Sequence, residues 1–221
     1  MKPTILRDQA AAPDGTPLTL HEHDGAFTIR VGGVELMSSR QHHSEERLAE
    51  LACAAIVSRR RARVLVGGLG MGFTLRRCLA CLADDAAVVV AELVPAVIHW
   101  NREPAYGLAA DALADPRVTV HEGDVTDVLW NDVGRFDAVI LDVDNGAAGL
   151  VAAGNDRLYS ARGLERTRRG LRPGGVLAVW STADDPEFVG RMRRVGFRTT
   201  VEKARIHATG GPWAFLFIGT A

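Results

Sequence analysis

The sequence predicts a doubly wound α/β fold, in which helices cover both faces of a mostly parallel sheet and a small β region comes first. After Ala62, short runs rich in Val, Ile and Leu alternate with segments of helical spacing, as in "RVLVG", "AAVVVAE", "VTVHE", "DAVILDV" and "GVLAVWS". Near-continuous apolar strands are buried on both faces, which favours a parallel sheet between helices. Before residue 44, apolar residues instead recur with a period of two. We therefore expect a small β region over residues 1–43 and an α/β domain over residues 44–221.

The two ends of the chain differ from this central pattern. The stretch "LTLHEHDGAFTIRVGGVELMSS" predicts short antiparallel strands with tight turns at Asp24-Gly25 and Gly32-Gly33. The next stretch, "SEERLAELACAAIVSRR", predicts a helix that Ser44 caps, with Glu45 and Glu46 in its first turn. Near the end, "FRTTVEKARIHATGGPWAFLFIG" predicts a terminal antiparallel hairpin that turns at Gly-Gly-Pro.

Composition and charge exclude several classes of function. A net charge of -1 gives no electrostatic reason to expect a nucleic-acid or anionic-membrane partner. No stretch approaches the ~20 apolar residues of a membrane span. The first residues lack the apolar core of a signal peptide, so we expect a cytoplasmic protein. Cys78 and Cys81 lie in a helical stretch without a second Cys or His pair nearby, which favours core packing over a redox or metal site.

The first strand of the predicted sheet runs into a turn crowded with glycine, in "VLVGGLGMGFTLRRCL". Its spacing departs from the dinucleotide fingerprint G-x-G-x-x-G, because Phe73 stands where the third glycine would be. Glycine lets the backbone turn sharply and approach a ligand, since no Cβ is in the way. The turn indicates either a ligand-binding loop around Gly68, Gly70 and Gly72 or a purely structural tight turn.

The next two strands each end close to a carboxylate. Glu92 stands 24 positions after Gly68, where it can accept hydrogen bonds from both hydroxyls of a ribose. The following strand ends at Gly123-Asp124, and an acid there can accept a hydrogen bond from the exocyclic amine of adenine. A helical stretch follows Asp124, so this carboxylate can equally cap a helix, and it can do both.

The fourth strand, "FDAVILDVDN", runs into Asp142, Asp144 and Asn145. Two carboxylates and an amide at this place favour a functional site, although Asp and Asn are also typical of turns. Ligands of open α/β sheets bind outside the carboxyl ends of the strands, where the strand order reverses. The sequence has no G-K-[ST] and no basic residue within the glycine turn. The four strand ends therefore exclude a P-loop nucleotidase, disfavour NAD(P), and favour an adenosyl group that carries a sulfonium.

Six stretches carry a resemblance to a known family: "MSSRQHHSEERLAELA", "VLVGGLGMGFTLRR", "VVVAELVPAVI", "DPRVTVHEGD", "FDAVILDVDN" and "LRPGGVLAVWS". From about Glu35 to Trp180 the chain resembles the spermidine synthase-like, or polyamine aminopropyltransferase-like, branch of the class I S-adenosylmethionine-dependent methyltransferase superfamily. The resemblance implies a Rossmann-like sheet of seven strands, a small N-terminal β region, an S-adenosyl donor and a homodimer. It also implies that Glu92 holds the ribose and Asp124 the adenine, in a donor site made of Gly68, Gly70, Met71, Gly72, Glu92, Leu93, Gly123, Asp124, Val125 and Asp142.

The chain departs from the family pattern at the other half of the site. Polyamine-making members resemble GGGDGG in the first loop, and Met71 stands where their Asp helps to hold the amine of the aminopropyl donor. Their DSSDP-like motif is matched at Asp142, but Asn145 replaces its second acid. Their Tyr-His/Gln-Glu segment becomes His43, Ser44 and Glu45, without the tyrosine.

These losses bear on the substrates. A diamine is dicationic at neutral pH, and its desolvation needs several carboxylates, so a putrescine site is less plausible here. An Asp in the place of Met71 would repel the methionine carboxylate and select the decarboxylated donor, whereas Met71 brings no such repulsion. We therefore expect a transferase acting on a small molecule with S-adenosylmethionine, and methyl transfer ranks slightly ahead. Aminopropyl transfer from decarboxylated S-adenosylmethionine, a non-catalytic nucleoside-binding protein and a dinucleotide enzyme remain alternatives.

Either transfer displaces sulfur from carbon, so the protein must align three atoms and accept a proton. Asp142 is the candidate base, and His43 is a second one because neutral imidazole is a competent base near pH 7. The alternative for His43 is a surface position before the helix. The candidate acceptor contacts are His43, Asp144, Asn145 and Tyr159, and core packing is the alternative for Tyr159. We expect no metal, and partners limited to a small-molecule acceptor and a second copy of the chain.

Overall fold

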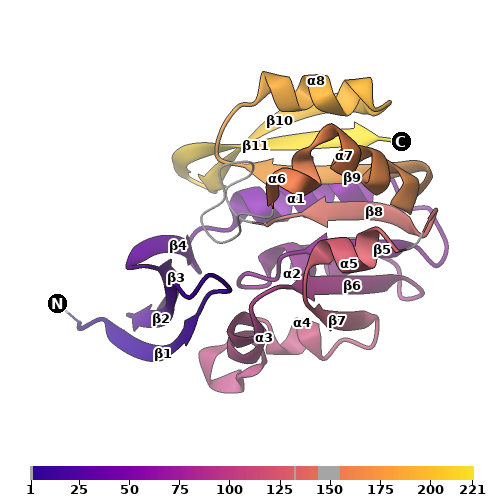
Figure 1. Ribbon diagram of the computed structural model, residues 1–221. Helices are drawn as coiled ribbons and strands as arrows, with labels where there is room; N and C mark the ends of the chain where they lie inside the picture. The colour runs from indigo at the N-terminus through magenta and orange to yellow at the C-terminus, as the bar shows by residue number, and fades with distance from the viewer. Residues whose placement is uncertain (1, 132, 144–154) are drawn as a thin grey trace.

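The computed structural model describes residues 2–131, 133–143 and 155–221, which form two sheets and their helices (Figure 1). The first sheet is antiparallel, with its strands in chain order: β1 (Ile5–Ala11), β2 (Pro17–His23), β3 (Ala26–Val31) and β4 (Val34–Ser38). Asp24-Gly25 and Gly32-Gly33 turn the chain with positive φ at each residue, as their types predict. The predicted N-terminal β region is thus confirmed.

The second sheet has seven strands in the order β10-β11-β9-β8-β5-β6-β7. Its parallel part runs from β9 to β7, and β11 and β10 add an antiparallel hairpin at one edge. The strand order reverses at β5, which lies between β8 and β6, so the fold has the expected doubly wound form. The strands are β5 (Arg63–Gly67), β6 (Ala87–Glu92), β7 (Val118–Glu122), β8 (Phe136–Leu141), β9 (Leu171–Ser181), β10 (Arg198–His207) and β11 (Gly210–Thr220).

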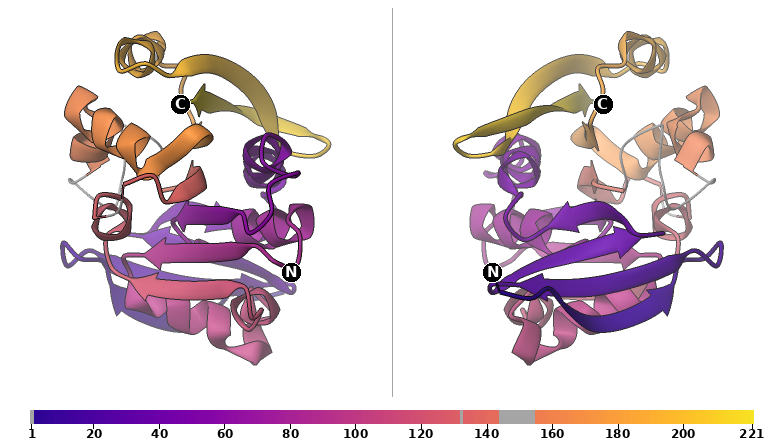
Figure 2. Two further views of the ribbon diagram at one scale, coloured as in Figure 1. Left: turned by 90° about the vertical axis from the view of Figure 1, so that its right-hand side faces the viewer. Right: turned by 90° about the vertical axis from the view of Figure 1, so that its left-hand side faces the viewer.

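Helices lie on both sides of the second sheet, as Figure 2 shows, and a separate apolar cluster fills the space under each layer. One cluster lies under α1 (His43–Ala54), α2 (Phe73–Cys81), α3 (Pro95–Arg102), the 3₁₀ turn η1 (Pro104–Tyr106) and α4 (Ala110–Leu113). The other cluster lies under α5 (Val125–Leu129), α6 (Asn155–Tyr159), α7 (Ala161–Gly170) and α8 (Pro186–Arg194). None of the helices in the described part of the chain has both the length and the apolar character of a membrane span.

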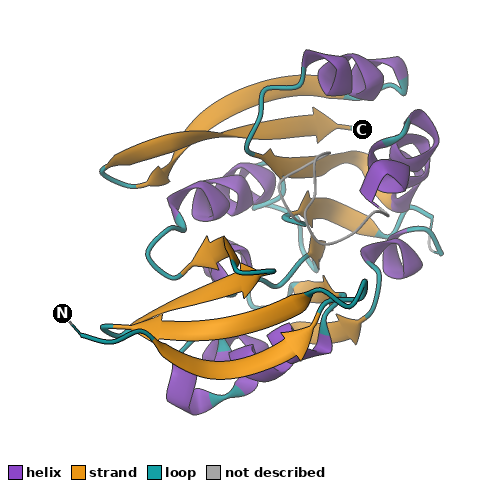
Figure 3. Cartoon of the chain, turned by 60° about the vertical axis from the view of Figure 1, so that its left-hand side comes forward, coloured by secondary structure: helices purple, strands orange, loops and turns teal. Residues whose placement is uncertain are grey.

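The N-terminal sheet lies across the carboxyl ends of the parallel strands (Figures 1 and 3). Its inner face carries Leu18, Leu20 and Ile29, each at most 1% exposed, and these residues join the same apolar cluster as α1 and α2. The indole Nε1 of Trp100 in α3 donates to Asp8 Oδ2 of β1 at 2.7 Å, which ties the two parts together. The edge of the sheet where chemistry is expected is therefore walled on one side by this small sheet.

Two local predictions are wrong. Ser44 does not cap α1, because the helix begins at His43 and the Ser44 hydroxyl donates to the Glu45 carboxylate at 2.6 Å. The terminal hairpin does not turn at Gly-Gly-Pro, because the antiparallel ladder continues to the pair His207 and Gly210 and leaves the turn to residues 208 and 209. In both places the element extends beyond the position that its local signal predicts.

Candidate active site

The glycine turn after β5 packs closely against neighbouring segments. Gly68, Gly70 and Gly72 all have positive φ, which L side chains rarely adopt. A Cβ on Gly68 would lie 2.3 Å from the Asp142 carbonyl oxygen, and one on Gly72 would lie 2.3 Å from Ala109 Cβ. The structural interpretation of the turn therefore applies, since these glycines let the loop pack against the residue after β8 and against α4, and its role in binding a ligand stays a prediction.

Asn101 holds this loop from behind. The side chain is fully buried in α3, and its Nδ2 donates to the Gly70 carbonyl at 2.7 Å and to the Val97 carbonyl at 2.8 Å. From the other side, Met37 of β4 lies so close that its Sδ would be 3.3 Å from a Cβ on Gly70. Sequence reasoning missed both residues, although an amide on the apolar face of a helix is a signal that could have found Asn101.

Glu92, at the end of β6, is buried at 8% exposure and is oriented by the backbone. Its Oε2 accepts from the Leu69 amide at 2.8 Å, and its Oε1 accepts from the Val94 amide at 2.8 Å. The first of these bonds joins the carboxylate directly to the glycine loop. Each carboxylate oxygen can accept more than one hydrogen bond, so the group keeps capacity for ligand hydroxyls.

Asp124 caps α5, as one of its two predicted roles requires. Its Oδ1 accepts from the Thr126 amide at 2.8 Å, while Oδ2 lies 3.6 Å from Nη2 of Arg157 in α6. Arg157 also lies over the indole of Trp130, 5.1 Å from the ring centroid. The cap fixes the carboxylate just after the end of β7, where the predicted adenine contact would also be made.

These strand ends line a first cavity at the carboxyl edge of the sheet. Eight of the residues predicted for the donor site lie in its wall: Gly68, Gly70, Glu92, Leu93, Gly123, Asp124, Val125 and Asp142. The N-terminal sheet closes it with Leu18, Ile29, Leu36 and Met37, and Ala91, Val94, Val97, Thr126, Val143 and Leu158 complete the lining.

A second cavity adjoins the first and shares Leu36, Met37, Gly70 and Asp142 with it. Met71 lines this second cavity rather than the first, and its side chain is only 3% exposed. Gly72 is in neither lining. The remaining members of this wall are Ser38, Gln41, Glu45, Leu69, Phe73 and Trp180.

Two acids face each other at the junction of the cavities. Asp142 Oδ2 accepts from the Thr74 hydroxyl at 2.5 Å, and Glu45 accepts from Ser44, whose own oxygen receives the Trp180 indole N–H at 3.0 Å. Burial, and next the charge of Asp142, raises the pKa of Glu45 to about 8, against the opposing effect of the Ser44 hydrogen bond. The family resemblance places Glu45 in a segment that frames the active site, but the sequence assigns this residue no role of its own beyond its place beside His43. Its signal is an acid in the first turn of a helix that runs to a strand end.

Other predicted acceptor contacts lie elsewhere. His43 is exposed at the start of α1 and is absent from the walls of both cavities, so its catalytic role remains a prediction. Tyr159 is buried at 3% exposure and packs edge-on against Phe188 with ring centroids 5.5 Å apart, which is the core packing left open above. Asp144 and Asn145 lie outside the described residues.

The cysteines pack between helices, as the sequence predicts for Cys78. Cys53 of α1 and Cys78 of α2 are buried with their sulfurs 3.6 Å apart, and Cys81 is half-buried. Among the residues that the structure describes, no group of His, Cys, Asp and Glu could hold a metal ion.

Known proteins share both the sequence pattern and the fold. Polyamine aminopropyltransferase 2 of Pseudomonas aeruginosa is 31% identical over 164 residues, which are 69% of this chain and 45% of that protein. The polyamine aminopropyltransferase of Mycobacterium tuberculosis is 30% identical over 193 residues, which are 83% of this chain and 35% of that protein. The chain thus spans less than half the length of these curated relatives. No protein-family model matches it.

Solved structures extend the comparison to the fold. A spermidine synthase in complex with the transition-state analogue AdoDATO superposes with a TM-score of 0.72 at 18% identity, over 97% of this chain and 72% of that one. The spermidine synthase of Thermotoga maritima gives a TM-score of 0.74 at 18% identity, with the same coverage. Both the small N-terminal sheet and the doubly wound sheet fall within the matched part.

Proposed function

The chain is a distant homologue in the spermidine synthase, or polyamine aminopropyltransferase, family, and from this relationship we propose that it is an S-adenosyl-dependent transferase acting on a small-molecule amine. Aminopropyl transfer from decarboxylated S-adenosylmethionine is the reaction that the named relatives support best. One observation carries the proposal: Asp142 lies in the walls of both cavities, where a donor and an acceptor would meet.

The first cavity fits an adenosyl donor. Glu92 is held by two backbone amides and keeps acceptor capacity for the ribose hydroxyls, and Asp124 is fixed by its cap where it can accept from the adenine amine. The cap on α5 and the bond to the glycine loop hold both carboxylates before a ligand arrives. Such preorganisation lowers the entropic cost of binding.

Asp142 would then serve the transfer itself. An amine arrives as an ammonium ion, which is not a nucleophile until it loses a proton. Asp142 accepts that proton, the nitrogen lone pair forms the new C–N bond, and the C–S bonding electrons leave with the sulfur, so that the sulfonium becomes a neutral thioether. The Thr74 hydrogen bond fixes one carboxylate oxygen, and alignment of nitrogen, carbon and sulfur supplies the rest of the catalysis.

Methyl transfer from S-adenosylmethionine is the second candidate, and one observation favours it. Met71 is buried and uncharged in the wall of the second cavity, where the polyamine-making pattern has an acid. A neutral side chain does not repel the carboxylate of intact S-adenosylmethionine, so the loop lacks that means of rejecting it.

Calorimetric titration with each donor, followed by identification of the products, separates these reactions. Aminopropyl transfer predicts tighter binding of the decarboxylated donor and methylthioadenosine as the by-product, whereas methyl transfer predicts S-adenosylhomocysteine. Met71→Asp should shift preference toward the decarboxylated donor about 10-fold, through repulsion of the methionine carboxylate. Met71→Leu is the matched control that keeps an apolar side chain. If neither donor binds, the proposal is wrong.

A further inference from the structure

The second cavity has an unequal distribution of polar and apolar groups. Six of its lining side chains are apolar: Leu36, Met37, Leu69, Met71, Phe73 and Trp180. Its described ionisable groups are two acids, Asp142 and Glu45, and the other polar side chains in its wall, Ser38 and Gln41, are uncharged. Of the residues that the structure describes, a ligand in this space therefore meets acids at one place and hydrocarbon or aromatic surface over most of the rest.

The two acids line the same cavity, and the charge of one acts on the other. The charge of Asp142 opposes ionisation of Glu45, and so, more weakly, does Glu46 of the same helix turn. Glu45 is held in place through Ser44 and the indole N–H of Trp180, and Asp142 through Thr74. Burial, and next the charge of Asp142, raise the pKa of Glu45 to about 8, so the two acids together present about one negative charge at neutral pH. One ammonium group matches that charge.

The apolar walls work against a second charge on the ligand. An ammonium group that leaves water for hydrocarbon surroundings needs a paired acceptor, and its transfer is costly without one. Met37 and Met71 are flexible and polarisable, so they can adapt to an apolar chain or a ring. Phe73 and Trp180 add flat apolar surface.

Building on the proposed function, we propose that the second cavity takes an amine with a single ammonium group and an apolar body, a hydrocarbon chain or an aromatic ring, and that Glu45 and Asp142 together hold the ammonium. This acceptor class differs from that of a diamine, whose far ammonium would meet the apolar wall. Glu45 thereby becomes an acceptor-binding residue, while Asp142 keeps the role of base.

Pentylamine and 1,4-diaminobutane provide a matched pair of probes, because a methyl group in one replaces an ammonium group in the other. Titration of the whole chain by calorimetry, with and without methylthioadenosine, should give at least about 10-fold tighter binding of pentylamine. Equal or tighter binding of 1,4-diaminobutane, or no binding of either amine, would overturn the inference.

Two variants sharpen the test. Glu45→Gln should weaken pentylamine binding about 10-fold, since one carboxyl group of the pair is gone. Gln41→Glu adds an acid of nearly the same shape to the wall and should move the preference toward 1,4-diaminobutane several-fold. An unchanged preference in Gln41→Glu would contradict the electrostatic argument. If pentylamine binds as expected but no donor supports its conversion, the proposed function fails while the acceptor assignment stands.

Discussion

Strand β8 carries an aspartate near each end, and the two have opposite surroundings. Asp137 is its second residue, at the amino edge of the sheet, and Asp142 follows its last residue at the carboxyl edge. The same side chain on the same buried strand thus serves two purposes. The neighbours that the fold brings to each edge account for the difference.

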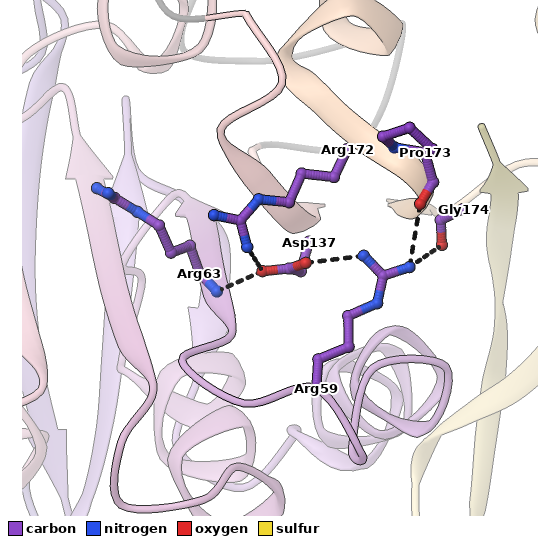
Figure 4. A network of polar contacts seen from close by, with 6 residues as sticks. All are labelled: Arg59, Arg63, Asp137, Arg172, Pro173 and Gly174. Atoms are coloured by element: carbon purple, nitrogen blue, oxygen red, sulfur yellow. Dashed lines mark hydrogen bonds and ion pairs between the residues drawn. The ribbon is translucent and has the colours of Figure 1, made fainter.

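Asp137 is surrounded by donors, as Figure 4 shows. Arg59 Nη1 donates to it at 2.8 Å, Arg172 Nη1 at 2.7 Å and the Arg63 amide at 2.8 Å. Burial by itself would raise the pKa of Asp137, but these hydrogen bonds and the charge of Arg172 hold it below the usual value. Because the Arg59 guanidinium also donates to the carbonyls of Pro173 and Gly174, the network joins the end of the α1 region to β8 and β9.

Asp142 meets a different partner. It accepts from Thr74, it lines both cavities, and its charge acts on another acid, Glu45. Paired with cations, a buried carboxylate stabilises the fold, whereas opposite a second carboxylate it costs stability and gains reactivity. The amino edge of β8 is therefore structural, and we propose the carboxyl edge as the place for chemistry, a division that three substitutions can test.

Asp137→Asn should cause the largest loss of stability. It removes the charge that two arginines share at a site where Asp137 is 1% exposed, so we expect the free energy of unfolding to fall by about 3 kcal/mol. Urea unfolding measures this, and donor affinity of the folded protein should not change. Glu202→Gln, which breaks the surface ion pair with Arg47, is the control and should cost less than about 1 kcal/mol. A similar small cost for Asp137→Asn would contradict the structural role.

Asp142→Asn should lower the activity without lowering the stability. The amide oxygen can still accept from Thr74, but it cannot take a proton, so the transfer rate should fall at least about 100-fold. The free energy of unfolding should stay the same or rise, because the repulsion with Glu45 disappears. Single-turnover product formation and urea unfolding of one preparation give both values. A variant that turns over normally, or unfolds as readily as Asp137→Asn, would refute the division between the two edges.

The sequence predicted the fold because its signals are local. Apolar runs of strand length and paired turn glycines each describe their own segment, and carboxyl ends of parallel strands necessarily meet at one edge. This is why Glu92, Asp124 and Asp142 could be placed near one another in advance, and why the structure brings them to one cavity.

The rest of the site depends on how separate segments pack. Met37 reaches the glycine loop only because the N-terminal sheet lies across the strand ends, and Glu45 faces Asp142 only because α1 begins beside that edge. No spacing in the chain encodes either meeting. The same reason explains why His43, chosen for its chemistry and its neighbours in sequence, lies exposed while Glu45, two residues later, lines the second cavity.

Glu45→Gln gives the most specific prediction, a change of stability that depends on pH. In the folded protein Glu45 keeps its proton up to a pKa of about 8, whereas an ordinary glutamate near 4.5 has already released it in the unfolded chain. The unfolded state therefore binds fewer protons across this window, and the free energy of unfolding contributed by Glu45 is full below the lower value and declines as pH rises toward the upper one. The amide of the variant does not titrate, so its stability relative to the natural chain should increase by about 3 to 4 kcal/mol between pH 5 and pH 8.

Urea unfolding at several pH values measures that difference directly, and Glu187→Gln, at a side chain that is 91% exposed, controls for the loss of one surface charge. The double variant Asp142→Asn with Glu45→Gln identifies the cause, because the effect of Glu45→Gln should shrink once the opposing charge is gone. An effect of the same size in both backgrounds would show that burial alone, and not the facing aspartate, holds the proton on Glu45. In that case the two acids would not form one unit, and the contrast between the ends of β8 would rest on Asp137 alone.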